Sequence, residues 1–171
     1  MKKFFTKVST FVFVVMISIS CKKDEDPGIQ CQNGAFEMTI NGEHVTGGTF
    51  NNTLLKGSSG GSNGKRMDIR VTDAKGRQII ITFTDLSSGT NGNGVTTNEY
   101  VAFDDIATGT ENVFIFTIID KNISYSFTDG KLDVTSCDAN AMQVSGTFSF
   151  SDSDYVVTNG SFTNMCYKIV Q

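Results

Sequence analysis

The sequence of 171 residues is poor in the residue types from which catalytic and metal sites are most often built. It has no tryptophan, one proline and one histidine, His44. A single histidine excludes sites that need several imidazole ligands, and it leaves one candidate for a histidine general base. Because His44 stands just past a predicted tight turn at Asn41-Gly42, we interpret it as an exposed hairpin residue.

The acidic clusters of the second half do not suggest catalysis. Asp104-Asp105 lies near Glu111, and Asp152 lies near Asp154. Adjacent carboxylates on a strand point to opposite faces, and Asp is favoured in turns because it accepts hydrogen bonds from the backbone. Neither cluster has the spacing of an EF-hand loop. We therefore predict that the protein is not an enzyme and has no catalytic residues, metal site or cofactor.

Basic residues are few once the N-terminal segment is set aside. Without Lys2, Lys3 and Lys7, eleven of the 14 basic side chains remain against 18 acidic ones, which is a net charge of −7. Nucleic acids are bound by clustered Lys and Arg, so an acidic chain argues against nucleic-acid partners.

The first twenty residues have the three zones of a secretory signal. A basic head of three lysines is followed by the apolar segment 8–19, and Ser18-Ile19-Ser20 leads into Cys21. The apolar segment fits the signal template of roughly 7–15 residues, and it is shorter than the roughly 20 apolar residues of a membrane-spanning helix. We predict that residues 1–20 are a removable export signal.

The residues around Cys21 resemble the lipobox of bacterial lipoproteins. That pattern has a small residue before the cysteine, which Ser20 provides, and usually a leucine three residues before it, where this chain has Ser18. The resemblance implies that Cys21 becomes the first residue of the mature chain, with a diacylglycerol on its thiol and an acyl chain such as palmitate on its amino group. At about 0.8 kcal/mol per buried methylene, several such chains make a durable anchor.

The segment after Cys21 resembles the charged tether of Bacteroidota lipoproteins. It is Lys22-Lys23-Asp24-Glu25-Asp26, followed by Pro27. In that group an acidic stretch near the lipid acts as a surface-export signal, and a residue other than Asp after the cysteine argues against retention at the inner membrane. The resemblance implies a lipid-anchored protein of the outer membrane that faces the cell exterior, with residues 21–34 as the lipidated cysteine and its tether.

Three cysteines follow the lipidation site: Cys31, Cys137 and Cys166. The envelope outside the cytoplasm permits disulfides, and an odd number allows one bridge and one free thiol. We expect a bridge to Cys166. Its partner is either Cys31, at the start of an adjacent first strand, or Cys137, at the end of a neighbouring hairpin.

Residues 35–171 have strand signals throughout and no helical periodicity. Val, Ile, Thr, Phe and Tyr stand in short runs that Asn-Gly, Asp-Gly and glycine clusters separate. The clearest hairpin joins 36–40 to 44–50 through Asn41-Gly42, a dipeptide that suits a type I′ turn. Segments 57–64 and 87–98 have the composition of flexible loops.

About ten short strands at this spacing predict a single all-β domain, an antiparallel β-sandwich, with a lipocalin-like closed barrel as the alternative. Gly146 and Gly160, inside strand patterns, indicate bulges or close backbone approaches. The predicted core consists of apolar residues at alternating strand positions: Phe36, Met38, Ile40, Ile69, Val71, Ile80, Phe114, Phe116, Ile118, Phe148, Phe150 and Phe162.

The domain also resembles a group of small Bacteroidota lipoproteins whose domain is of unknown function. The resemblance rests on the motifs at 36–42, 144–150 and 157–162, which consist of strand and turn residues. It implies a fold and brings no catalytic residues.

These observations favour a non-enzymatic binding module that is anchored to the membrane by lipid. Segments 57–64 and 87–98 would supply the contact surface, as loops on a rigid scaffold often do. The ligand, a protein or a glycan, is not identified by the sequence. Two alternatives stay open: an immunity or inhibitor lipoprotein with an acidic face against a basic toxin or enzyme, and a small-molecule carrier if the fold is a barrel.

The anchor and tether predict that the domain is exposed on the cell surface. Protease added to intact cells should digest it, and a detergent-lysed sample serves as the control. Protection until lysis would contradict surface exposure and favour a role inside the periplasm.

Overall fold

The computed structural model describes residues 34–59, 62–87, 89, 92–102, 112–127 and 129–170. The predicted signal, the lipidation site Cys21, the charged segment Lys22–Asp26 and Cys31 lie outside these residues, so the predictions about them stay predictions.

The described residues form twelve strands and no helix, which confirms the all-β prediction. The strands are β1 (Ala35–Ile40), β2 (Glu43–Phe50), β3 (Thr53–Ser59), β4 (Ser62–Asp73), β5 (Gln78–Asp85), β6 (Glu99–Ala102), β7 (Val113–Asp120), β8 (Ile123–Phe127), β9 (Gly130–Asp138), β10 (Gln143–Ser151), β11 (Val156–Cys166) and β12 (Lys168–Val170).

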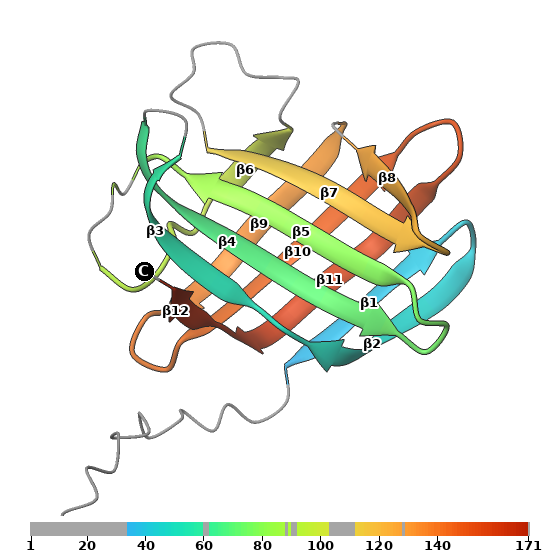
Figure 1. The fold of residues 1–171 in the computed structure, drawn as a ribbon, viewed down its shortest axis with the longest axis horizontal. Coiled ribbons are helices and arrows are strands. Elements are labelled where there is room, and N and C mark those ends of the chain that lie inside the picture. Colours follow the sequence, from blue (N-terminus) through green and yellow to red (C-terminus); the bar gives the residue numbers. More distant parts are fainter. Residues whose placement is uncertain are drawn as a thin grey trace, which may run out of the picture.

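The strands form two layers that cross over a shared core, as a sandwich does (Figure 1). The layer that we call sheet A has the order β2-β1-β11-β10-β9-β6, and sheet B has the order β12-β3-β4-β5-β7-β8. Most pairs are antiparallel, but β6 is parallel to β7 and β12 is parallel to β3. The predicted sandwich is therefore confirmed, with two short parallel pairs that the sequence did not indicate.

Two strands belong to both sheets and form the corners of the sandwich. The first half of β2 pairs with β1 and its second half with β4, across an irregularity between Gly47 and Thr49. Strand β6 pairs with β9 through Tyr100 and with β7 through Val101. Backbone pairing therefore runs around the molecule and returns through β4 and β5, a continuity that the barrel alternative shares, while the layers pack face to face.

Three hairpin turns show the conformations that their local sequences favour. Asn41 and Gly42 have φ values of 48° and 83°, so the β1–β2 hairpin has the positive φ pair of a type I′ turn. Lys121 and Asn122 have φ values of 50° and 67° in the β7–β8 hairpin. The Asp73 carboxylate closes the β4–β5 turn by accepting the backbone N–H of Lys75 at 2.8 Å.

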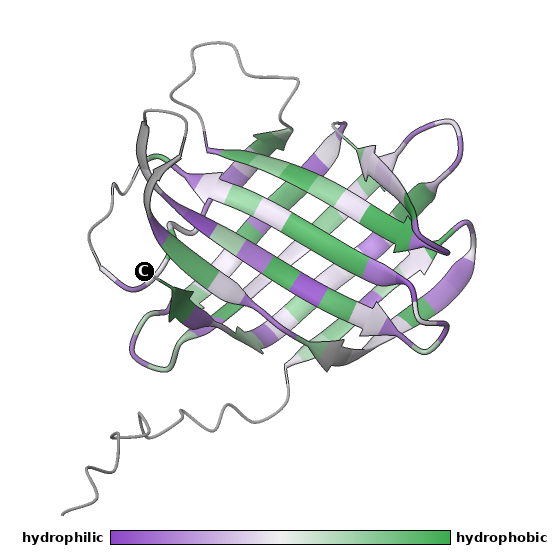
Figure 2. Ribbon diagram, viewed as in Figure 1, coloured by the Kyte–Doolittle hydropathy of each residue, from purple (hydrophilic) through white to green (hydrophobic). Residues whose placement is uncertain are grey.

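Aromatic side chains of the two sheets meet in the core. Phe116 of β7 stacks on Phe150 of β10 with ring centroids 4.0 Å apart. The centroid of the Phe148 ring lies 5.8 Å from that of Phe116. Figure 2 shows the resulting alternation of apolar and polar residues along the strands. Eleven of the twelve predicted core residues are buried. Ile80 is the exception, because Ile79 and Ile81 point inward and the period of two turns Ile80 to the outer face.

The prediction of a flexible loop at 57–64 is wrong. Gly57 pairs with Gly64 and Ser59 with Ser62, so the segment is the end of the β3–β4 hairpin. Glycine and serine have low strand propensity, but the cross-strand pairing that begins at Thr53 and Asp68 continues through them. The strand count rises to twelve partly because β12 forms after Tyr167.

Gly146 and Gly160 are close backbone approaches, as predicted. A Cβ on Gly146 would overlap the Phe162 ring, and a Cβ on Gly160 would overlap the Phe148 ring and lie 2.6 Å from the Phe148 carbonyl oxygen. The register of the β10–β11 pair also shifts next to each glycine.

Replacing Gly160 with alanine is expected to destabilise the domain by about 1–3 kcal/mol, because the added methyl group forces the packed Phe148 ring to move. Gly48→Ala is the matched control: its Cβ would meet only the Thr72 carbonyl oxygen, at 3.6 Å, so a change within about 0.5 kcal/mol is expected. Urea unfolding measures both. Equal losses in the two variants would contradict the close approach.

Candidate functional site

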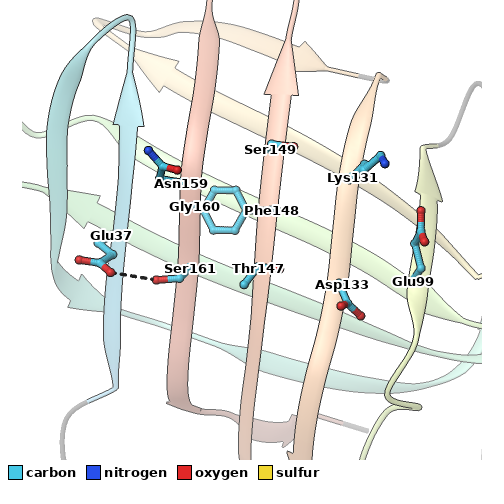
Figure 3. A pocket seen from close by; sticks show the side chains of 10 residues that line it. All are labelled: Glu37, Glu99, Lys131, Asp133, Thr147, Phe148, Ser149, Asn159, Gly160 and Ser161. Carbon is cyan, nitrogen blue, oxygen red and sulfur yellow. Dashed lines mark hydrogen bonds between the residues drawn. The ribbon is translucent and has the colours of Figure 1, made fainter.

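A shallow polar groove of about 470 Å³ lies on the outer face of sheet A (Figure 3). Its volume is in the range of small-ligand sites, roughly 300–1,000 Å³, and most of its lining residues have polar side chains, whereas such sites are lined mainly by apolar residues. The lining residues come from β1, β6, β9, β10 and β11: Glu37, Glu99, Lys131, Asp133, Thr147, Phe148, Ser149, Asn159, Gly160 and Ser161.

Five of these side chains form one row across the sheet. Glu37 pairs with Ser161 and Ser161 with Thr147. Thr147 pairs with Asp133, which pairs with Glu99. Cross-strand partners point to the same face, and with neighbouring strands about 4.8 Å apart the row is about 19 Å long. We call this set, Glu37-Ser161-Thr147-Asp133-Glu99, the polar row.

Strand alternation explains why these residues face outward. Phe148 and Phe162 are buried, so Thr147 and Ser161, one position away, point to the opposite face. The Ser161 hydroxyl donates a hydrogen bond to the Glu37 carboxylate at 3.3 Å. The small hydroxyl side chains in the middle of the row leave the groove open between acidic ends (Figure 3).

The charges that line the groove are mostly negative. Three carboxylates line it against one ammonium group, that of Lys131. Glu99 and Asp133 stand directly opposite each other on neighbouring strands. Like charges in that position destabilise a sheet, whereas opposite charges or two threonines would stabilise it. An arrangement that costs stability at an exposed groove is typical of a functional surface.

The predicted loop at 87–98 is anchored where it is described. The fully buried Asp85 carboxylate accepts hydrogen bonds from the Thr96 N–H at 2.7 Å and the Ser87 hydroxyl at 2.9 Å. The Asn112 side-chain oxygen accepts the N–H of Leu86 at 2.8 Å, and the buried Lys65 ammonium donates to the Gly94 carbonyl. This polar network ties the described residues of the segment to β4 through Lys65 and to β5 through Asp85.

Two of the four tyrosines are structural. Tyr100 and Tyr167 are 1% and 4% exposed, and burial raises the pKa of both hydroxyls. The Tyr100 hydroxyl donates to the Thr96 carbonyl at 3.0 Å and the Tyr167 hydroxyl to the Asn93 carbonyl at 2.5 Å, so both hold the 87–98 segment. Tyr125 and Tyr155 are half-buried and form an edge-to-face pair with centroids 4.9 Å apart.

The residues weighed for catalysis or metal binding do not converge among those described. His44 is exposed on β2, next to the turn. Asp152 accepts the N–H of Asp154 at 2.7 Å and of Tyr155 at 2.8 Å, which is the turn role expected for it. In the described part of the chain no three His, Cys, Asp or Glu residues are placed to hold a metal ion, and Asp104, Asp105 and Glu111 lie outside it.

The glycine-rich segment contains the pattern Gly-x-Ser-x-Gly twice, at 57–61 and 60–64. In hydrolases this pattern forms a sharp strand-to-helix turn that exposes the serine. Here the described residues on both sides of the tip are paired strands, β3 and β4. The pattern therefore reflects glycine and serine composition.

Cys166 is disulfide-bonded and Cys137 is a free, half-buried thiol. Because Cys137 is free, the predicted bridge to Cys166 keeps Cys31 as its expected partner, and Cys31 lies outside the described residues. Gly34 packs against Met165, and a Cβ added to Gly34 would lie 2.9 Å from the Met165 Cα, so the chain enters β1 beside the end of β11. This neighbourhood favours Cys31, three residues before Gly34, as the partner.

No protein-family model, curated protein or solved structure matches the chain. The described residues contain no helix that is long and apolar enough to cross a membrane.

Sequence reasoning did not find the groove. Glu37 and Thr147 occupy polar positions of alternating strands, which is what any solvent-facing strand residue does. The missing information is the order β1-β11-β10-β9-β6 and its register, which bring positions far apart in the chain into one row.

Peptide mapping without reduction should recover Cys31 linked to Cys166 and Cys137 alkylated as a free thiol. Reduction is expected to cost about 2–4 kcal/mol of stability, because the bridge closes a long loop in the unfolded chain. A Cys21–Cys166 link would contradict both this pairing and the lipid anchor.

Proposed function

We propose that this protein is a lipoprotein of the outer membrane that binds an external ligand and catalyses no reaction. Cys21 carries the lipid, Lys22–Asp26 direct export to the cell surface, and residues 21–34 tether the domain. The observation that carries the binding role is the polar row, with its acidic ends and hydroxyl centre on an open face.

The groove suits a polar ligand that is neutral or positively charged. The carboxylates can accept hydrogen bonds from a hydroxyl-rich chain, and the hydroxyls and the Asn159 amide can both accept and donate them. The three carboxylates repel an anionic chain. A neutral glycan lying across the strands matches this chemistry. Without an aromatic platform in the groove, binding depends on hydrogen bonds that compete with water, so a modest affinity is expected.

The acidic ends of the row favour a second candidate, an immunity or inhibitor lipoprotein. A basic toxin or enzyme would gain association rate from electrostatic steering towards Glu37, Glu99 and Asp133. The carrier alternative has less support, because aromatic rings of both sheets, such as Phe116 and Phe150, fill the space where a barrel would hold its ligand.

The groove is tested by placing an arginine in it. Thr147→Arg fills the centre of the polar row. Thr163→Arg makes the same exchange at an exposed position of β11 that lies opposite Ala35 and outside the groove. Calorimetry would use three probes: neutral linear oligosaccharides, an oligolysine peptide and heparin. We expect the wild-type protein to bind the neutral glycan and not heparin. In Thr147→Arg the affinity for the glycan should be at least about tenfold lower, a loss of about 1.4 kcal/mol. In Thr163→Arg it should be unchanged.

Oligolysine binding without glycan binding would move the proposal to the basic-partner candidate. If neither the neutral glycan nor oligolysine binds, or if the two arginine variants have equal effects, the groove is not the binding site.

A further inference from the structure

The open strand edges of the molecule are few. Because β2 and β6 pair into both sheets, sheet A has no free edge, and among the described residues only β8 and β12 have a single neighbour. Strand β12 has three residues, and β8 has five. Strand β8 lies at the outer edge of sheet B, beside β7 (Figure 1).

The backbone groups of two serines point away from the sheet at this edge. In the two-residue hairpin, Asp120 and Ile123 form the hydrogen-bonded pair next to the turn, and pairs alternate from there. Ile123, Tyr125 and Phe127 therefore bond to β7. The N–H and C=O groups of Ser124 and Ser126 face outward, where a further strand can accept and donate hydrogen bonds.

Edge strands of soluble proteins are usually protected by charged side chains, proline or a bulge. Strand β8, Ile-Ser-Tyr-Ser-Phe, has no charged residue and no proline, and its register with β7 is continuous. Ile123 is 56% exposed, and the half-buried pair Tyr125–Tyr155 adds apolar surface beside the edge. The edge of β8 therefore lacks these protective features and can pair with a further strand.

We propose that β8 pairs antiparallel with β8 of a second copy of this chain. A twofold axis through Tyr125 places Ser124 opposite Ser126 of the second copy, and Ser126 opposite its Ser124. Each of these pairs has outward backbone groups on both sides, so each exchanges two hydrogen bonds. The contact is isologous and closes as a dimer, in which sheet B continues from one copy into the other.

Charge complementarity at the strand ends supports a second copy as the occupant. Lys121 precedes β8 and Asp129 follows it, and both are exposed. The same twofold arrangement brings the turn that holds Lys121 to the end of β8 that Asp129 follows in the second copy, and the reverse. Opposite charges on neighbouring strands stabilise pairing, whereas a parallel arrangement would bring like charges together.

The dimer is expected to be weak in dilute solution. A single edge-to-edge strand pair buries far less than the roughly 1,200–2,000 Å² of a stable interface. Attachment of both copies to one membrane, which rests on the proposed lipid anchor, would raise their effective concentration and populate the pair.

The test uses full-length chain in detergent at high concentration, as an equal mixture of ¹⁴N- and ¹⁵N-labelled protein. A zero-length carboxyl–amine cross-linker joins Lys121 to Asp129 where they are in contact. Mass spectrometry should find this link between a light and a heavy peptide. Links only within one isotope, or no such link, would overturn the proposal.

Variants separate strand pairing from general association. Ser126→Pro removes an outward N–H that β7 does not use, so the mixed-isotope link should be lost at unchanged unfolding temperature, while Ser126→Ala should keep it. Lys121→Glu should lose the link, and Lys121→Glu with Asp129→Lys should restore it with the charges exchanged. Persistence of the dimer in Ser126→Pro, or no recovery in the double variant, would overturn the antiparallel arrangement.

Discussion

Packing of aromatic rings between the two sheets is the constraint on which the rest of the structure depends. Phe116 of β7 lies against Phe148 and Phe150 of β10, and Phe148 in turn stacks on Phe36 of β1 at 5.5 Å. These rings fix which residues of each sheet A strand point inward. A slip of one residue in any of these strands would turn its aromatic side chains to solvent.

The proposed binding surface follows from that constraint. Once Phe148 and Phe162 are held inside, Thr147 and Ser161 are held outside in register, and Gly160 gives the Phe148 ring its space. The groove is therefore formed by paired strands, and the described residues of segment 87–98 are held by hydrogen bonds to Asp85 and Asn112. The two outer features also lie on different sheets: the polar row on sheet A, and the open edge of β8 on sheet B. A copy paired through β8 would keep its groove free for ligand.

The sequence predicts what depends on neighbours along the chain. Asn41-Gly42 specifies its own turn, and alternation identifies eleven of the twelve predicted core residues as buried. Prediction from the sequence fails where pairing with distant strands determines the conformation of a segment. Segment 57–64 is paired because β3 and β4 continue past their apolar residues, and Ile80 faces outward because its two isoleucine neighbours take the inner positions. The polar row is invisible to local patterns, because its residues come from five strands.

The register of sheet A is the feature on which both the core and the polar row depend. Nuclear Overhauser contacts between backbone protons of β9, β10 and β11 report this register in solution. We expect contacts that join Thr147 to Ser161 on one side and to Asp133 on the other. Contacts displaced by one residue, joining Phe148 to Ser161 or to Asp133, would turn the aromatic core outward, dissolve the polar row and contradict the proposed binding surface.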